Sequence, residues 1–228
     1  MKIEIETTGI CNAECPACTR FSFNRDTLEL FHKEQILPKT ILDVDAFKNF
    51  CNTINEDKLE ICFEGSFSDP LTHPKILELV KTACSIENSI VVIKTNGSLR
   101  NQKLYGELGK LLNRIHPSNR QMFFSIDGLG EQNSIYRRKT NWDKIMGNAH
   151  AFIDAGGVAT WKVVHFEQHE KDYDEMKKLS KSMGFFNFHV HQNRANKVTQ
   201  DQIFKLGKEY TPIPIPDDLI QMNLDHFQ

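Results

Sequence analysis

Residues 9–18 read GICNAECPAC, and this short stretch contains three of the six cysteines in the chain. Cys11, Cys15 and Cys18 have a C-x3-C-x2-C spacing. Three thiolates from one loop can bind three irons of a cuboidal iron–sulfur cluster and leave the fourth iron open to another ligand. The triad alone also allows a zinc site or three unrelated buried thiols. Structural zinc usually takes four ligands from paired knuckles, however, and the sequence has no second C-x2-C.

The other cysteines, Cys51, Cys62 and Cys84, do not extend this motif, and none occurs after Cys84. Such crowding near one end is a poor disulfide framework. Cys51 falls in a predicted helix and Cys62 in a predicted strand, so neither is well placed as the fourth ligand that a ferredoxin-like carrier needs. We expect all three to be buried core thiols.

The cysteine loop follows the first of six predicted strands, which alternation and β-branched or aromatic runs place at residues 2–7, 58–63, 89–94, 121–126, 158–166 and 185–191. Apolar residues at three- and four-residue spacing predict intervening helices at 44–54, 75–85, 103–115, 142–155 and 172–183. Asp43 is a candidate N-cap, and Gly156 and Gly184 are stop signals. The predicted order is therefore βαβαβαβαβαβ.

Repeated strand–helix units predict parallel strands joined by right-handed crossovers. The expected fold class is α/β, a partial (β/α)6 TIM-type barrel of parallel strands over residues 1–193. A doubly wound open sheet is the alternative, because periodicity does not separate the two. In both folds the chemistry gathers at the carboxyl ends of the strands. Residues 194–228 are expected to form a short C-terminal extension, with a helix at 199–210 and a Pro-rich arm or cap.

Three further segments at predicted strand ends complete a pattern. Residues 64–74 read EGSFSDPLTHP, residues 94–97 read KTNG, and residues 125–128 read SIDG, with Tyr136-Arg137 downstream. Together with the cysteine loop, they resemble the cysteine, Gly-Gly-Glu-Pro, Thr-Asn-Gly and Ser-Ile-Asp-Gly motifs of the radical S-adenosylmethionine (radical SAM) superfamily. The resemblance covers about residues 3–190. Ala17 departs from it, because an aromatic residue often precedes the third cysteine in that superfamily.

The resemblance implies a role for each matched residue. Cys11, Cys15 and Cys18 would ligate a [4Fe-4S] cluster whose remaining iron takes the amine and carboxylate of S-adenosylmethionine (SAM). The residues implied to bind this cofactor are Phe67, Ser68 and Asp69 at the methionine amine, Ser125 and Asp127 at the ribose, Arg137 at the methionine carboxylate, and Asn96, which is expected to shape its turn. A planar guanidinium suits a carboxylate best.

The resemblance also implies the reaction class. Reductive cleavage of SAM gives a 5′-deoxyadenosyl radical that abstracts hydrogen from a substrate, so an oxygen-sensitive enzyme and an electron donor such as flavodoxin or ferredoxin are expected. The open side of a partial barrel favours a peptide or protein side chain as substrate, with a nucleotide-derived small molecule second. Cys62, one residue before its strand ends, is an alternative hydrogen donor to the substrate radical. The rival hypotheses are a degenerate cluster- or SAM-binding protein without turnover and a zinc-stabilised interaction domain.

Several of these residues also have ordinary structural explanations. Asp69 is a candidate turn or N-cap residue, and Asp127-Gly128 a candidate strand-ending turn. Arg138 is expected on the surface.

Other polar residues fall late in the chain. His189 and His191 share one face of the last predicted strand, where structural histidines are expected rather than a second metal site. Trp161 and Lys162 are expected near the pocket.

Composition limits the other possibilities. Lys plus Arg is 28 and Asp plus Glu is 30, so the formal charge of −2 predicts no general nucleic-acid binding. A hydrophobic content of 39% supports a sizeable core. No apolar run approaches the roughly 20 residues of a membrane span, and residues 1–6 lack a signal-peptide pattern, so we expect a cytoplasmic protein without membrane contact. The absence of later cysteines predicts a single-cluster member without an auxiliary-cluster domain, and residues 19–42 are a candidate lid, bottom cover or dimer contact.

Overall fold

The computed structural model describes residues 1–16, 18, 20–23, 30–32 and 40–191. Within this part of the chain six parallel strands form one sheet in the order β1-β4-β5-β6-β7-β8. The strands are β1 (Lys2–Glu6), β4 (Glu60–Glu64), β5 (Ile90–Thr95), β6 (Arg120–Ser125), β7 (Ala159–Val164) and β8 (Asn187–His191). The α-helices are α1 (Val44–Thr53), α2 (Ile76–Cys84), α3 (Gln102–Leu112), α4 (Gln132–Tyr136), α5 (Trp142–Asp154) and α6 (Tyr173–Ser182). Short 3-10 helices are η1 (Pro70–Thr72), η2 (Pro117–Asn119) and η3 (Glu167–Asp172).

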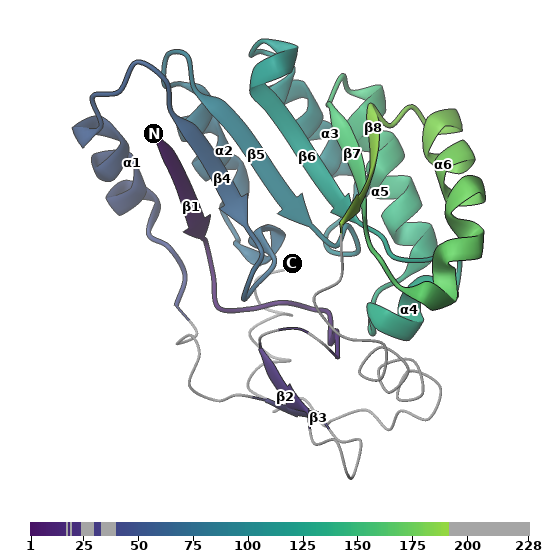
Figure 1. The fold of residues 1–228 in the computed structure, drawn as a ribbon. Coiled ribbons are helices and arrows are strands. Elements are labelled where there is room, and N and C mark those ends of the chain that lie inside the picture. The colour runs from purple at the N-terminus through teal and green to yellow at the C-terminus, as the bar shows by residue number, and fades with distance from the viewer. Residues whose placement is uncertain (17, 19, 24–29, 33–39, 192–228) are drawn as a thin grey trace.

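The strand order follows the chain order without a reversal, and this decides between the two α/β alternatives. In a doubly wound sheet the strand order reverses at a switch point, and helices lie on both faces of the sheet. Here the crossover helices α2, α3, α5 and α6 cover one face, and the other face is turned toward the viewer in Figure 1. The predicted partial (β/α)6 barrel is confirmed.

Local signals place the helix ends close to their predicted positions. The side chain of Asp43 accepts a hydrogen bond from Ala46 N at 2.8 Å and caps α1. Gly156 and Gly184 follow α5 and α6 with φ of +87° and +84°, a conformation that glycine adopts without a steric penalty.

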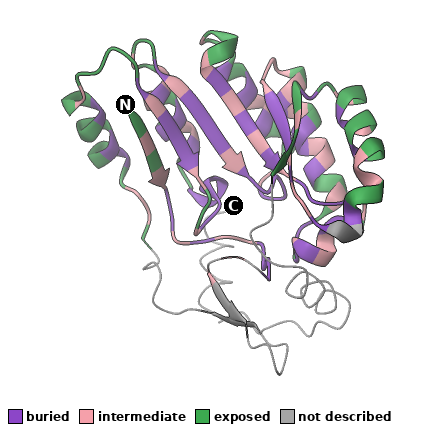
Figure 2. Ribbon diagram, viewed as in Figure 1, coloured by how far each residue is buried: buried purple, intermediate pink, exposed green. Residues whose placement is uncertain are grey.

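The two faces of the sheet differ in chemistry. In β4, Ile61 and Phe63 join the core between sheet and helices, whereas the alternate residues Cys62 and Glu64 lie on the opposite, concave face. Figure 2 shows the buried interior of the sheet between the more exposed outer helix surfaces. Trp161 is wrongly predicted near the pocket, because it is fully buried in the helix-side core.

Three other expectations can be compared with the structure. Cys51 and Cys84 pack in or against the helix-side core, as expected. Cys62 is also buried, at 1% exposed, but on the opposite face of the sheet. The helix α4 and the antiparallel pair β2 (Phe21–Phe23) and β3 (Leu30–His32), within the 19–42 segment, were not predicted. Residues 19, 24–29 and 33–39 of that segment, Ala17, and the predicted extension at 194–228 lie outside the described residues. No helix in the described ranges has the length and apolarity needed to cross a membrane.

Candidate functional site

The four motif loops meet at the carboxyl ends of β1, β4, β5 and β6, where they surround a cavity of about 330 Å³. All three motif cysteines line it. The other lining residues are Ala13, Arg20, Glu64, Gly65, Ser66, Ser68, Asp69, Lys94, Thr95, Asn96, Ser125, Tyr136, Arg137 and Lys162. The structure therefore brings together most of the residues that the sequence assigned to one site.

The cysteine loop is attached to three other motifs through polar contacts. Asp69 N donates to Ile10 O at 2.9 Å, and Asn96 Nδ2 donates to Asn12 Oδ1 at 2.7 Å. On the opposite side, Lys139 forms an ion pair of 2.6 Å with Glu14, a buried residue. These contacts fix the loop, so its thiols are positioned by the fold rather than by the loop sequence alone.

The environment of the thiols fits an iron–sulfur cluster. Burial raises the pKa of Cys11 and of Cys15 to about 12, so cluster binding must displace their protons. Cys11 Sγ accepts contacts from Ala13 N at 3.4 Å and Asn96 Nδ2 at 3.8 Å. No three His, Cys, Asp or Glu side chains in the described ranges converge on a point suited to one metal ion. A cuboidal cluster places each thiolate on a different iron, so three thiols spread around one cavity fit it.

Asp69 ties the β4 loop to the β5 loop. Its carboxylate accepts hydrogen bonds from Leu71 N at 3.0 Å, Asn96 N at 2.8 Å and Thr95 Oγ1 at 2.9 Å. The predicted N-cap role is confirmed, because the first of these bonds caps η1. Asp69 is 2% exposed, and its acceptors are used within the chain.

Glu6, which the sequence reasoning missed, fixes the same loop after β4 through hydrogen bonds to its carboxylate. It accepts from Ser66 N at 2.8 Å, Phe67 N at 3.0 Å and Ser68 Oγ at 2.5 Å. Gly65 is required here, because a Cβ at this position would lie 2.8 Å from Ser68 O. Strand alternation places Glu6 on the polar face, but no sequence signal reveals that its partner lies 60 residues away.

Asn96 shapes the turn after β5, as expected. Its Oδ1 accepts from Ser98 N at 2.9 Å, and its side-chain amide reaches the cysteine loop. Gly97 follows with φ of +77°, and a Cβ there would lie 2.9 Å from the Phe124 ring. The Thr-Asn-Gly segment is therefore a connector between β5 and the cysteines.

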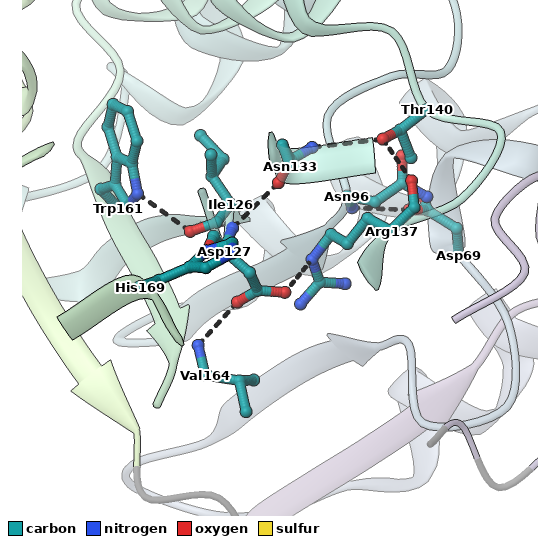
Figure 3. A network of polar contacts seen from close by, with 10 residues as sticks. All are labelled: Asp69, Asn96, Ile126, Asp127, Asn133, Arg137, Thr140, Trp161, Val164 and His169. Atoms are coloured by element: carbon teal, nitrogen blue, oxygen red, sulfur yellow. Dashed lines mark hydrogen bonds and ion pairs between the residues drawn. The ribbon is translucent and has the colours of Figure 1, made fainter. Parts of the chain in front are cut away.

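Arg137 and Asp127 form a buried ion pair, with 2.7 Å between Arg137 Nε and Asp127 Oδ2 (Figure 3). The other oxygen of Asp127 accepts from Val164 N at 2.6 Å, and His169 Nδ1 contacts the Asp127 carbonyl at 2.5 Å. Burial opposes the charge of Arg137, but the Asp127 carboxylate outweighs it and raises the pKa of the guanidinium. Arg137 also lines the cavity.

Asp127, expected to bind the ribose or to line its pocket, is fully buried, and its two carboxylate oxygens are engaged by Val164 and Arg137. Its role at a ribose stays a prediction. One expectation about this region is wrong. Arg138, expected on the surface, is only 4% exposed, because the segment after α4 packs against the cysteine loop.

The concave wall beneath the cavity carries Glu64, Lys94 and Lys162. Glu64 pairs with Lys94 and also accepts from Cys62 Sγ at 3.4 Å. Burial raises the pKa of the Cys62 thiol to about 12. Burial, assisted by the charge of Lys94, lowers the pKa of Lys162. Lys162 thus lies at the pocket, as expected.

The late histidines have separate positions. His169 is buried against Asp127, and His165 Nδ1 contacts Tyr173 Oη at 3.0 Å. His189 and His191 are exposed on β8, with ring centroids 6.3 Å apart. Their neighbour Phe188 packs on Trp161, so the two histidines lie on the concave side of the sheet.

Comparison with known proteins finds no matching family model and no matching curated protein. Solved structures of radical SAM enzymes do match. Streptococcus suis SuiB bound to S-adenosylmethionine has a TM-score of 0.63 at 13% identity, covering 98% of this chain and 46% of that chain. Native anSMEcpe with bound AdoMet has a TM-score of 0.61 at 15% identity, covering 89% and 57%. A mutant of spore photoproduct lyase with a dinucleoside spore photoproduct has a TM-score of 0.54 at 14% identity, covering 96% and 71%.

These likenesses establish the fold, which is that of the partial barrels of radical SAM enzymes. The chain spans about half the length of the SuiB and anSMEcpe chains that it matches.

Proposed function

We propose that the chain is a radical SAM enzyme that binds a [4Fe-4S] cluster through Cys11, Cys15 and Cys18. The observation that carries this proposal is the convergence of all three thiols on one cavity, with the loop held by the Asp69, Asn96 and Lys139 contacts. When bound and reduced by an external one-electron donor, such a cluster would supply the electron for cleaving SAM to methionine and a 5′-deoxyadenosyl radical, the species that abstracts hydrogen from a substrate.

The residues around the cavity are suited to orient SAM. Arg137 offers its guanidinium to the methionine carboxylate, and Asp127 keeps that guanidinium charged and in place. The β4 loop, fixed by Glu6 and Asp69, offers backbone carbonyls near Phe67 and Ser68 to the methionine amine. Ser125 is proposed at the ribose. Asp69 acts mainly by holding the loop, since its oxygens already accept four contacts.

The substrate is proposed to be a peptide or protein side chain, with a nucleotide-derived molecule second. Among the matched structures, SuiB is bound to the precursor peptide SuiA, anSMEcpe to a Cp18Cys peptide, and spore photoproduct lyase to a dinucleoside spore photoproduct. Cys62 lies on the concave face and is proposed as a hydrogen donor. A flavodoxin or ferredoxin is proposed as the electron donor.

The test is anaerobic reconstitution with iron and sulfide, followed by SAM and dithionite, with mass-spectrometric detection of 5′-deoxyadenosine. Wild type and Cys84→Ala are expected to form the product, because Cys84 packs against the helix-side core. Cys15→Ala is expected to lose the cluster and all product. Equal product from Cys15→Ala would refute the proposal. Iron-loaded wild type that binds SAM without cleaving it, even with candidate peptides, would support the rival cofactor-binding protein.

A further inference from the structure

Lys162 occupies a distinctive position on the concave face. It lies on β7 in register with Ser125 of β6 and His189 of β8. Its neighbours Trp161 and Val163 are in the helix-side core, so the Lys162 side chain is on the opposite face and lines the same cavity as the cysteines. It therefore stands beside the proposed SAM site, one strand nearer the β8 edge than Ser125.

Three other cations on this face have anionic partners: Lys94 pairs with Glu64, Arg137 with Asp127, and Lys2 with Glu4 at 2.9 Å. Arg20, which also lines the cavity, donates to the carbonyl oxygens of Cys11 at 3.3 Å and Ala13 at 3.4 Å. Within the described residues, no carboxylate lies within ion-pair distance of Lys162 and no acceptor takes a hydrogen bond from it. Lys162 is partly buried, and a partly desolvated ammonium without a counter-ion is unfavourable. Such a group is stabilised when a ligand brings an anion to it.

We propose that Lys162 is the receptor for an oxyanion of the substrate, a carboxylate or phosphate group held beside the SAM site. The proposal rests on the proposed function and deepens it by naming a chemical feature of the substrate. SAM has one carboxylate, and Arg137 is suited to that group by its planar geometry. Lys162 is left for a second anion. In a peptide this is an acidic side chain or C-terminus, and in a nucleotide-derived molecule it is a phosphate.

The neighbouring side chains make this receptor selective. Glu64, Lys94 and Lys162 line one wall, and Glu64 neutralises Lys94, so the net positive charge of this trio resides at Lys162. Phe123 on the adjacent strand β6, and Thr160 and Val164 on β7 itself, alternate with core residues and continue the concave surface. A substrate with an oxyanion near an uncharged segment fits this pattern better than a polycation or an extended polyanion.

The experiment is residue-resolved acetylation of the anaerobically reconstituted protein, with rates at each lysine measured by mass spectrometry. Pyrophosphate and succinate serve as the phosphate and carboxylate probes, at constant ionic strength. Either probe is expected to slow acetylation of Lys162 by about tenfold at saturation. The exposed Lys110 is the internal reference and is expected to keep its rate. Protection by pyrophosphate alone identifies a phosphate receptor, and protection by succinate alone identifies a carboxylate receptor.

Calorimetric titration with the protecting probe supplies a second readout. Lys162→Met should lose binding by about tenfold or more, Lys162→Arg should retain it, and Lys110→Met should match wild type. Lys162→Met is also expected to unfold at the same or a higher temperature, because it removes an unpaired, partly buried charge. Neither readout requires SAM cleavage. A protein that binds the probe but forms no 5′-deoxyadenosine would therefore refute the proposed enzyme activity and leave the proposed oxyanion binding by Lys162 intact.

Two results would overturn the proposal that Lys162 binds an oxyanion of the substrate. One is the absence of protection by both probes, or equal protection of Lys162 and Lys110. The other is full protection of Lys162 by SAM alone, which would assign the residue to the cofactor.

Discussion

The two parts of the cavity wall differ in how their polar groups are satisfied. At the loops after β1, β4, β5 and β6, side chains bind one another: Asp69 accepts from Asn96 N, Asn96 donates to Asn12, and Glu6 accepts from the β4 loop. Arg137 pairs with Asp127 in the same region. On the β7 wall, Lys162 has no protein anion among the described residues. The first region is preorganised before any ligand arrives. In the second region the charge of Lys162 is left for a ligand to neutralise. This difference is what we expect if the first region binds the proposed cofactor and the second binds the proposed substrate.

The preorganised region can be broken most severely at the Asp127–Arg137 pair. Asp127→Asn leaves the guanidinium without its buried counter-charge, and the free energy of unfolding should fall by about 3–5 kcal/mol. Asp45→Asn is the matched control, because it removes the exposed Lys48–Asp45 pair and should leave stability close to wild type. Urea unfolding under anaerobic conditions measures both. Equal stability of the two variants would show that the buried pair does not organise this region.

The variant Arg137→Lys tests whether the same region binds the methionine carboxylate of SAM. Lysine keeps the charge but loses the planar arrangement of donors, so SAM affinity should weaken by about ten- to hundredfold. Iron content should stay unchanged, because the cysteines retain their contacts. Equilibrium binding of SAM to the reconstituted protein measures the effect. Unchanged affinity would place the methionine carboxylate elsewhere.

The sequence was sufficient to predict the six strands of the parallel sheet, the five helices between them and the loops that form the site, but not α4 or the β2–β3 pair. Hydrophobic periodicity gave the six strands, and the carboxyl ends of parallel strands must share one edge, which gathers the cysteines with Asp69 and Asn96. Cap chemistry at Asp43 and Gly156 located helix ends because those signals are local.

Long-range pairings were not predictable in the same way. Glu6 and Asp127 acquire their roles from partners far away in the sequence, Ser66 in the loop after β4 and Val164 on β7, and no local pattern encodes such a choice. Arg138 was misplaced because a basic run is usually solvated, whereas here the segment packs on the cysteine loop. Strand alternation alone also could not say which face of β7 pointed inward, and so Trp161 and Lys162 were treated alike.

The smallest expected effect is on the pH dependence of stability, and it arises from His73, near the end of the loop after β4. Lys75 N donates to its Nδ1 at 3.0 Å, so its Nε2 carries the hydrogen that reaches Leu42 O at 2.8 Å. Burial lowers the pKa of His73 below its ordinary value of 6.5. The unfolded chain therefore binds a proton more readily than the native protein, and stability should fall as pH drops below about 6.5.

This pH dependence can be checked by thermal unfolding between neutral and mildly acidic pH. His73→Gln should show a shallower decrease in stability than wild type, because it removes the buried imidazole. Identical slopes in the two proteins would exclude His73 as the cause.

The central claim is that the cysteine loop holds a cluster whose open iron faces a SAM site. Electron paramagnetic resonance of the dithionite-reduced, reconstituted protein tests it directly. The account predicts a reduced [4Fe-4S] signal whose g-values change when SAM is added, and no such signal in Cys15→Ala. A cluster signal that saturating SAM leaves unchanged, or one that persists in Cys15→Ala, would contradict it.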